Sequence, residues 1–261
     1  MSQQNKLAEM LSEAARAARR AYLEAIDTMS LEERRRTIGQ GADGTETFLL
    51  DVIVEEPVLD VVARHGVNVL SEEVGWIDRG SAVTVVVDPV DGTANAAAGV
   101  PIAAFAAAAV VDDVIEAAEV LWFDTGREWA VLRDDVRPVT VSGRRSLEGS
   151  AVSLLRPRPS TVAAWGRVAE RASRVRVLGS SVVEACLVAD GAIDLFCDPG
   201  GDVHRIVDIA ATKLLVEQAG GCVVDLNSRP FTFEPDLRLR WSGVFAATPE
   251  LADDAIATIR S

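Results

Sequence analysis

The chain has 261 residues, of which 49% are hydrophobic, and its formal net charge is −14 with a sequence isoelectric point near 4.6. This length fits one large domain or two smaller ones, and the acidic balance argues against nucleic acids and anionic membranes as partners. The longest uncharged apolar run, residues 100–111, is too short to span a membrane, so the sequence predicts no transmembrane helix.

The first half of the sequence predicts mixed helices and strands. Apolar residues at helical spacing predict a helix over 7–26, and a second helix over 48–63 follows a polar, glycine-rich loop at 39–45. Pro57 should kink or break this second helix. Residues 67–70 and 83–87 are predicted strands. Turn acids then separate four runs that predict an antiparallel meander, at 102–111, 114–122, 128–132 and 136–139.

After Gly143 the pattern changes to alternating strands and helices, which indicates an α/β unit. The predicted strands are 151–155, 175–178, 193–197, 222–224 and 244–246. The predicted helices are 161–171, 180–189, 206–219 and 249–259. Neither a repeat nor a low-complexity linker separates the two parts. We therefore expect two tightly packed halves, an amino-terminal α+β half over 1–142 and a carboxy-terminal α/β half over 143–261.

Residues 88–93, Asp-Pro-Val-Asp-Gly-Thr, are the most informative segment. They follow a β-branched apolar run that predicts a buried strand, and Pro89 and Gly92 favour a turn. Two carboxylates, Asp88 and Asp91, would therefore emerge together at a strand end. Buried carboxylates need a cationic partner. Because the neighbouring sequence offers few Lys or Arg, we expect that partner to be a divalent metal ion.

Three further acids, Asp51, Glu72 and Asp208, stand at the ends of predicted elements. Taken singly, each has an ordinary explanation: a surface residue, a solvated turn and a helix cap, respectively. Together with Asp88 and Asp91 they form a set of hard oxygen ligands without His or Cys, which suits Mg²⁺ better than zinc. The exposed carbonyl of Val90 is a further candidate ligand, and the Thr93 hydroxyl with its neighbouring amides could hold a phosphate or orient a water.

Two compositional features bear on environment. All but two of the 26 basic residues are arginine. Acidic excess with scarce lysine is typical of adaptation to high salt, and a GC-rich genome, which favours Arg and Ala, explains the bias equally well. The chain starts with a helical pattern and no signal peptide, so we expect a cytoplasmic protein. Cys186, Cys197 and Cys222 lack a CxxC spacing, which predicts buried apolar side chains rather than disulfides or zinc ligands.

Residues 88–95 resemble the DPxDGTxN signature of the inositol monophosphatase superfamily of metal-dependent, lithium-sensitive phosphatases. Four other segments resemble motifs of that family, in the same order. They are 71–73 for GEE with Ser in place of Gly, 179–181 for GSxA, 207–212 for WDxAAG with Val207 replacing Trp and Thr212 replacing Gly, and 217–221 for EAGG. Residues 41–45 and 204–208 resemble the archaeal branch, which includes enzymes that act on both inositol phosphates and fructose 1,6-bisphosphate.

The resemblance implies an α-β-α-β-α sandwich, a homodimer and a set of metal ligands. Glu72, Asp88 and the Val90 carbonyl would hold one ion. Asp88, Asp91 and Asp208 would hold a second, and a weaker third ion would lean on Glu72. The expected ion is Mg²⁺, with Mn²⁺ as a substitute and Li⁺ and Ca²⁺ as inhibitors.

The resemblance also implies roles around the substrate. Asp51, Glu72 and Thr93 would be catalytic, positioning the attacking water and relaying its proton. The amides of Gly92 and Thr93 would receive the phosphate. The loop at Ser180 and Ser181 and the side chain of Arg205 would bind substrate, although an ion pair with a surface acid explains Arg205 equally well.

The activity expected from this resemblance is Mg²⁺-dependent hydrolysis of a small polyol or sugar phosphate. Inositol 1-phosphate is the first choice, fructose 1,6-bisphosphate the second and a nucleotide 3′-phosphate the third. Residues 96–98 are alanines where the family often has larger side chains, and the loop at 198–205 lacks the lysine of the archaeal pattern. Fewer cationic contacts favour a monophosphate. A catalytically silent binding or regulatory member of the family is the alternative.

Overall fold

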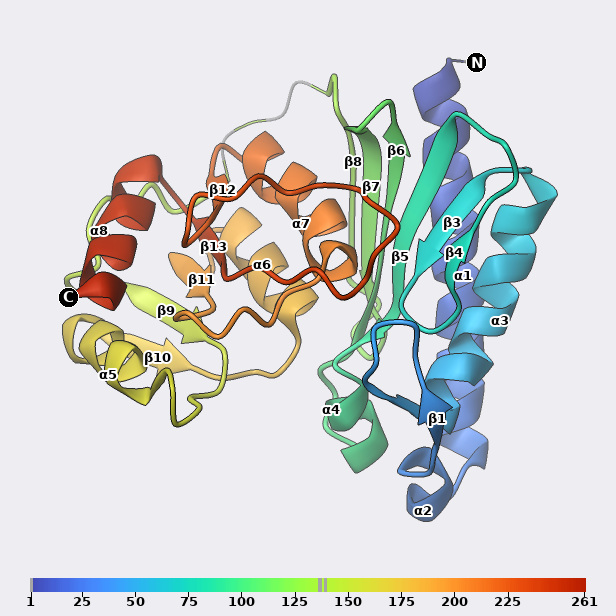
Figure 1. Ribbon diagram of the computed structural model, residues 1–261, viewed down its shortest axis with the longest axis horizontal. Helices are drawn as coiled ribbons and strands as arrows, with labels where there is room; N and C mark the ends of the chain where they lie inside the picture. The colour runs from blue at the N-terminus through green and yellow to red at the C-terminus, as the bar shows by residue number, and fades with distance from the viewer. Residues whose placement is uncertain (1, 136–137, 139) are drawn as a thin grey trace.

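Helical layers alternate with two large β-sheets through the molecule (Figure 1). The structure is a computed structural model and describes residues 2–135, 138 and 140–261. Its helices are α1 (Gln3–Thr28), α2 (Leu31–Arg34), α3 (Leu49–Arg64), α4 (Thr93–Ala98), α5 (Val162–Arg171), α6 (Ser181–Ala189), α7 (Ile206–Gln218) and α8 (Pro249–Arg260). Its strands are β1 (Thr37–Gln40), β2 (Glu46–Phe48), β3 (Asn68–Ser71), β4 (Gly75–Ile77), β5 (Val83–Asp91), β6 (Ala104–Val111), β7 (Val114–Trp122), β8 (Glu128–Leu132), β9 (Ala151–Leu154), β10 (Arg174–Arg176), β11 (Leu195–Cys197), β12 (Cys222–Asp225) and β13 (Gly243–Ala246).

The larger sheet has the strand order β4-β3-β5-β6-β7-β8. Helices α1 and α3 cover one of its faces, and α6 and α7 cover the other (Figure 1). The second sheet, in the order β10-β9-β11-β13-β12, lies on the far side of α6 and α7, and α5 and α8 form the outermost layer beyond it. The layers therefore run α-β-α-β-α, which confirms the fold expected from the sequence.

Strand β6 shows why the larger sheet accepts helices on both faces. Its sequence is Ala-Phe-Ala-Ala-Ala-Ala-Val-Val, and all but the last residue are buried. Successive side chains point to opposite faces, so Phe105, Ala107 and Ala109 join the core under α1 while Ala106 and Ala108 join the core under α6 and α7. The small alanines let both helical layers approach the strand closely.

Most predicted elements lie within three residues of their observed ends. The expected break at Pro57 is wrong, because α3 continues through it from Leu49 to Arg64. Burial of Val54, Val58 and Val62 on that helix offsets the hydrogen bond that proline removes. The short elements α2, α4, β1, β2 and β4 carry too little periodicity to be predicted. Of the predicted strand at 136–139, only Pro138 lies among the described residues.

Two simpler expectations can also be compared with the structure. Within the described ranges, no helix is long and apolar enough to cross a membrane. Cys186 and Cys197 are buried, Cys222 is half-buried, and all three are free thiols. The prediction of buried, unpaired cysteines is confirmed for Cys186 and Cys197, whereas Cys222 is free but only half-buried.

Candidate active site

The two acids of the 88–93 segment meet because strand β5 is irregular at its end. Asp88 pairs with Ala106 of β6, but Asp91 pairs with Ala104, so three steps along β5 oppose two along β6. In a regular strand, residues three apart point to opposite faces. The bulge at Pro89 and Val90 removes that alternation, and both carboxylates reach the same site.

Asp208 joins these two acids from the other half of the chain. It is the third residue of α7, and its carboxylate accepts a hydrogen bond from the Arg205 backbone N–H at 2.6 Å. Carboxylate oxygens of Asp88, Asp91 and Asp208 all lie within 4.8 Å of one another. The three residues are only 0%, 7% and 5% exposed. Asp208 is thus both a helix cap and a member of a buried acidic cluster.

The cluster is electrostatically strained as it stands. Burial raises the pKa of Asp88 well above its ordinary value, and the charges of Glu72 and Asp91 raise it further. Burial also raises the pKa of Asp91 to about 7, with a contribution from Asp208. In addition, the buried Oδ2 atom of Asp88 has no hydrogen-bond partner among the described residues. A buried, unpartnered carboxylate oxygen requires a physical explanation, and binding of a cation would provide one.

These residues fit a hard divalent cation. All donors at the cluster are oxygens, and neither His nor Cys belongs to it. Mg²⁺ and similar ions prefer carboxylate and carbonyl oxygens, and their charge would relieve the repulsion that raises the pKa values of Asp88 and Asp91. The sequence-based prediction of a metal site is supported by this donor set.

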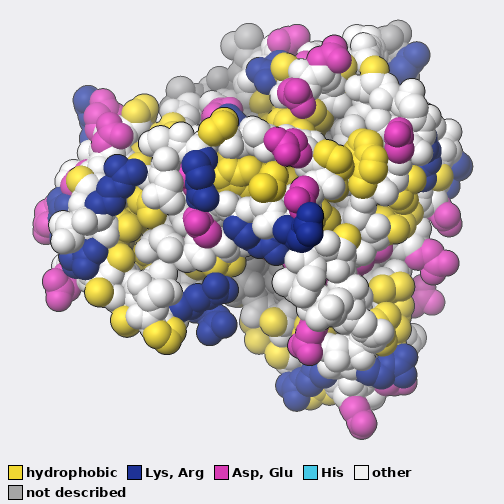
Figure 2. Space-filling model, in the orientation of Figure 1, with side chains coloured by type: hydrophobic (Ala, Val, Ile, Leu, Met, Phe, Trp, Pro, Cys, Tyr) yellow, Lys and Arg dark blue, Asp and Glu magenta, His cyan; other side chains and the backbone are white. Residues whose placement is uncertain are grey.

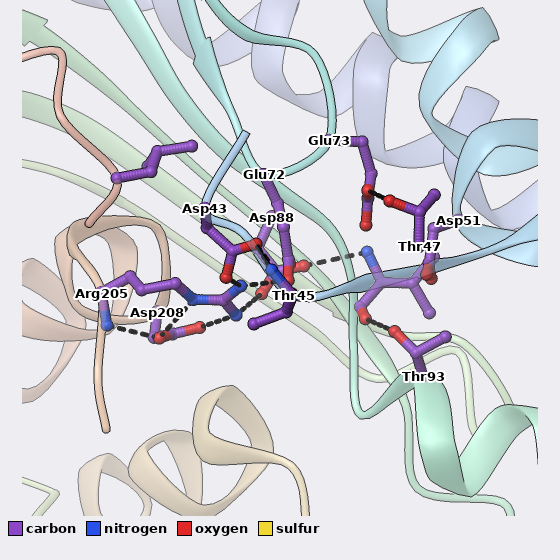
Figure 3. Close-up of polar contacts among 12 residues, drawn as sticks. Asp43, Thr45, Thr47, Asp51, Glu72, Glu73, Asp88, Thr93, Arg205 and Asp208 are labelled. Atoms are coloured by element: carbon purple, nitrogen blue, oxygen red, sulfur yellow. Dashed lines mark hydrogen bonds and ion pairs between the residues drawn. The ribbon is translucent and has the colours of Figure 1, made fainter. Parts of the chain in front are cut away.

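The Arg205 guanidinium lies at the edge of the acidic cluster (Figure 3). It donates to Asp208 at 2.9 Å and also pairs with Glu72 at close range, and its distance to Asp88 is 3.9 Å. Burial opposes the charge on Arg205, but Asp208 and Glu72 hold its pKa well above the usual range. The sequence analysis expected a divalent metal ion as the cationic partner of Asp88 and Asp91, and did not pair Arg205 with this cluster. The structure shows that a distant arginine also neutralises these acids.

Asp43 is a site residue that sequence reasoning missed. Its carboxylate accepts hydrogen bonds from the Thr45 N–H and hydroxyl at 2.8 and 2.7 Å and forms an ion pair with Arg205 at 2.9 Å. Burial works against ionisation, but the Thr45 hydrogen bonds and the Arg205 cation hold the pKa of Asp43 below its ordinary value. Asp43 lies in the glycine-rich loop between β1 and β2. An acid in that loop was the available signal.

Asp51 and Thr93 lie beside the cluster rather than within it (Figure 3). Asp51 is only 4% exposed, and one of its oxygens accepts from the Phe48 N–H at 3.0 Å. The other oxygen is buried without a hydrogen-bond partner. Burial raises the pKa of Asp51 to about 8, Glu72 adds to this, and the Thr93 hydroxyl opposes it. Asp51 is therefore a buried residue facing the site, not a surface residue.

The turn after Asp91 holds the start of α4 in place. Gly92 has φ +87°, a left-handed conformation, and a Cβ there would lie 2.7 Å from the Ile102 carbonyl oxygen. The Thr93 hydroxyl donates to the Val90 carbonyl at 2.8 Å. The first amides of α4 have no helical acceptor and point out of its start. This geometry allows the phosphate contact expected at Gly92 and Thr93.

The loop before α6 supports Asp91 from behind. The Ser180 hydroxyl donates to Asp91, and the Val182 N–H donates to the same carboxylate oxygen at 3.0 Å. The Ser180 oxygen also caps α6 by accepting from the Val183 N–H at 3.3 Å. Ser180 is thus occupied by protein contacts, whereas Ser181 lines the adjoining cavity.

A cavity of about 420 Å³ opens beside the cluster. It lies between α4 on one side and the segments that follow β9, β10 and β11 on the other, and Figure 2 shows the molecule hollowed between these two sides. Asp91 belongs to both the cavity wall and the acidic cluster. The volume of the cavity falls within the roughly 300–1,000 Å³ typical of small-molecule sites. A small ligand in this cavity would therefore reach the cluster.

His204 takes no part in this cavity. It is fully buried among aromatic rings, including Phe196 and Phe245, and its Nδ1 atom accepts a hydrogen bond from the Gly243 N–H at 3.1 Å. Burial lowers its pKa, which favours the neutral form of the ring. The structure therefore assigns His204 to the core.

Comparison with known proteins places this site in a family. The family model described as "Inositol monophosphatase family" matches residues 135–261. A protein of Thermococcus kodakarensis named "Fructose-1,6-bisphosphatase/inositol-1-monophosphatase" is 35% identical over 201 residues, which cover 74% of this chain and 75% of the relative. "Inositol-1-monophosphatase ImpA" of Mycolicibacterium smegmatis is 30% identical over 81% of this chain and 79% of its own length.

A solved structure agrees with these sequence matches. The MJ0109 gene product, described as an inositol monophosphatase-fructose 1,6 bisphosphatase, superposes with a TM-score of 0.85 at 25% identity. The superposition covers 96% of this chain and 98% of that one. The likeness therefore extends through both halves of the fold and includes the elements that carry the acidic cluster.

Proposed function

The chain belongs to the inositol monophosphatase family of metal-dependent phosphatases, and from this premise we propose that it is a Mg²⁺-dependent phosphatase of a small polyol or sugar phosphate. The observation that carries the proposal is the convergence of Asp88, Asp91 and Asp208 at the wall of a cavity of ligand size. These carboxylates would hold the metal ions together with Glu72 and the Val90 carbonyl. Two or three ions are expected.

The bound ions would neutralise the dianionic ester and lower the pKa of an attacking water. The protein supplies the positions. Asp51 faces the site with one unpartnered oxygen, so it is suited to accept a proton from a water that the Thr93 hydroxyl helps to orient. Glu72 would share the proton relay. The amides of Gly92 and Thr93 would hold the phosphate at the start of α4.

Arg205 would have a changed role once metal is bound. Its guanidinium pairs with Glu72 and Asp208, two of the carboxylates that we propose as metal ligands. We infer that a metal ion would compete with Arg205 for these acids, and that Arg205 would then be free to contact the substrate phosphate. The substrate contact is one of the two expectations drawn from the sequence for Arg205. The other, an ion pair with a surface acid, is corrected, because the acids that it contacts include the buried Asp43 and Asp208.

Inositol 1-phosphate and fructose 1,6-bisphosphate are the leading substrates. Several relatives of 27–35% identity carry both activities in their names, which supports testing both esters together. A relative named "Bifunctional NADP phosphatase/NAD kinase" matches over 81% of this chain, so a nucleotide phosphate belongs in the same panel.

Phosphate release from such a panel tests the proposal. The purified protein should hydrolyse at least one ester in Mg²⁺ and none in a chelator, with a generic aryl phosphate as a further substrate. Assays at low and at molar salt would also show whether the acidic surface reflects adaptation to salt. Silence toward every ester in a folded sample would instead favour a binding or regulatory protein.

We also propose that the protein is a cytoplasmic homodimer whose two halves, 1–142 and 143–261, form one cooperative unit. The dimer rests on the family resemblance. The cooperative unit rests on the cluster, since Asp88 and Asp208 come from different halves. Sedimentation of a single species of 27.8 kDa would contradict the dimer. Two separate unfolding transitions would contradict the single unit.

A further inference from the structure

Two arginines line the cavity at the opposite wall from α4. Arg156 and Arg158 lie in the loop between β9 and α5, and both are exposed. Neither guanidinium has a hydrogen-bond or ion-pair partner in the part of the chain that the structure describes. Figure 2 shows basic side chains at the margin of the hollow between the two sides of the molecule. The site therefore has cations that sequence reasoning did not count.

Asp198, an acid of the same cavity wall, forms no ion pair with them in the described part of the chain. It is 1% exposed, and its two oxygens accept from the Gly201 N–H at 2.7 Å and the Val203 N–H at 3.0 Å. The chain carries 40 acidic residues against 26 basic ones. Two unpaired arginines facing one cavity are therefore notable in so acidic a protein.

The loop that carries these arginines is held in shape. Its sequence is Arg156-Pro157-Arg158-Pro159, and each proline restricts its own φ and the residue before it. The Arg158 N–H donates to the Thr161 hydroxyl at 3.0 Å, and the Thr161 N–H donates back to the Arg158 carbonyl at 2.9 Å. A restrained loop loses less entropy when its side chains bind a ligand.

The remaining cavity wall is mixed, with polar residues such as Asn95 and Ser181 beside an apolar part. Leu155, Val177 and Val203 contribute to the apolar part, and Asp91 lies at the end that meets the acidic cluster. A ligand would thus have one phosphate at the cluster, carbon-bound hydrogens against the apolar wall and a second anionic group at the arginines. Arginine is well suited to bind phosphate through paired N–H donors.

We propose that Arg156 and Arg158 form a subsite for a second phosphate and so select phosphate esters that carry two phosphate groups. This rests on the proposed function and deepens it. It reverses the preference for a monophosphate drawn from the alanines at 96–98, because cationic contacts missing from that segment are supplied by the β9–α5 loop.

Fructose 1,6-bisphosphate and fructose 1-phosphate provide the test, because they share the phosphate at carbon 1 and differ in the second one. The wild type should show a higher kcat/KM for the bisphosphate. The double variant Arg156→Gln/Arg158→Gln should lose about 10- to 100-fold of that preference, mainly through KM. Arg20→Gln, an exposed arginine on α1, is the matched control and should keep the preference.

The kinetic results for the two esters decide whether the arginine subsite exists. Equal kcat/KM for the two esters in the wild type, or a preference that survives in the double variant, would overturn the subsite. Hydrolysis of fructose 1-phosphate by the wild type separates this failure from failure of the proposed function, which predicts turnover. If neither ester is hydrolysed, protection of the wild type against heat by fructose 1,6-bisphosphate still decides the subsite. That protection must disappear in the double variant.

Discussion

Arg205 and Asp43 form an ion pair of 2.9 Å across 162 positions of the chain. The pair joins the start of α7 to the glycine-rich loop between β1 and β2. Because Arg205 also contacts Glu72 and Asp208, one guanidinium links three acids around the candidate metal site. Arg205 therefore supplies these acids with a cation from the protein itself.

Replacing Arg205 should lower the stability of the protein in chelator and enlarge the stabilisation that Mg²⁺ provides. Arg205→Gln leaves Asp43, Glu72 and Asp208 without their partner, so the free energy of unfolding in chelator should fall by about 3 kcal/mol. The added stability from Mg²⁺ should become larger than in the wild type, because a competitor is gone. Urea unfolding with and without Mg²⁺ measures both effects.

Arg229→Gln is the control for this experiment. Arg229 also pairs with two carboxylates, Asp202 and Asp225, but away from the cluster. The Arg229→Gln variant should lower the free energy of unfolding by the same amount in chelator and in Mg²⁺. If Arg205→Gln behaves in the same way, competition between Arg205 and metal is excluded.

Asp88→Asn should abolish turnover. Asp88 is fully buried at the centre of the cluster, and the variant removes a negative charge that the ions require. Steady-state assays in saturating Mg²⁺ measure the loss, with Asp60→Asn on α3 as an exposed control. A variant that keeps more than about a tenth of the wild-type rate would show that the assignment of two ions bridged by Asp88 is wrong.

Mg²⁺ should stabilise the folded protein. The ion binds only the folded arrangement of Asp88, Asp91 and Asp208, so at about 100 times its dissociation constant it should add about 2.7 kcal/mol. Calorimetry in Mg²⁺ and in chelator measures the change in Tm. Asp208→Asn should reduce the shift strongly. A wild-type Tm that is equal in the two conditions would contradict a specific site.

Gly92→Ala should destabilise the protein and impair the phosphate contact. The left-handed φ of +87° and the Ile102 carbonyl 2.7 Å from the new Cβ both oppose a side chain, so we expect a loss of roughly 1–3 kcal/mol. Gly166→Ala is the matched control, since Gly166 lies inside α5 with open space around it. The Gly166→Ala variant should be more stable than the wild type by up to about 1 kcal/mol in the free energy of unfolding. Equal effects of the two substitutions on chemical unfolding would refute the argument.

Glu119 should make stability depend on pH outside the active site. Burial raises its pKa to about 8, the neighbouring Glu128 adds to this, and Arg16 opposes it. The folded state therefore retains a proton that the unfolded state has lost between about pH 4.5 and 8, and stability falls as the pH rises through that window. Relative to Glu119→Gln, the wild type should lose up to about 1.4 kcal/mol per pH unit. Urea unfolding at a series of pH values measures this difference. If the free energy of unfolding depends on pH in the same way for both proteins, the raised pKa of Glu119 is contradicted.

The sequence by itself predicted most of the helices and strands and the chemical nature of the site, and its family resemblance implied the layered fold. Apolar spacing predicted the long helices, and β-branched and alanine-rich runs predicted β5 and β6. The segment 88–93, with Glu72 and Asp208, predicted an oxygen-rich metal site because buried carboxylates need a cationic partner. The patterns that predict helices and strands are local, and the acids were found by their residue type and motif rather than by any known proximity.

Only the tertiary structure decided which groups surround that site. The bulge that turns Asp88 and Asp91 to one side depends on how β5 pairs with β6. The pairing of Arg205 with Asp43 depends on the packing of α7 against a loop from the other half. The approach of Arg156 and Arg158 to the cavity likewise depends on the β9–α5 loop facing α4. Electrostatic partners follow distances in space, and periodicity along the chain does not encode those distances.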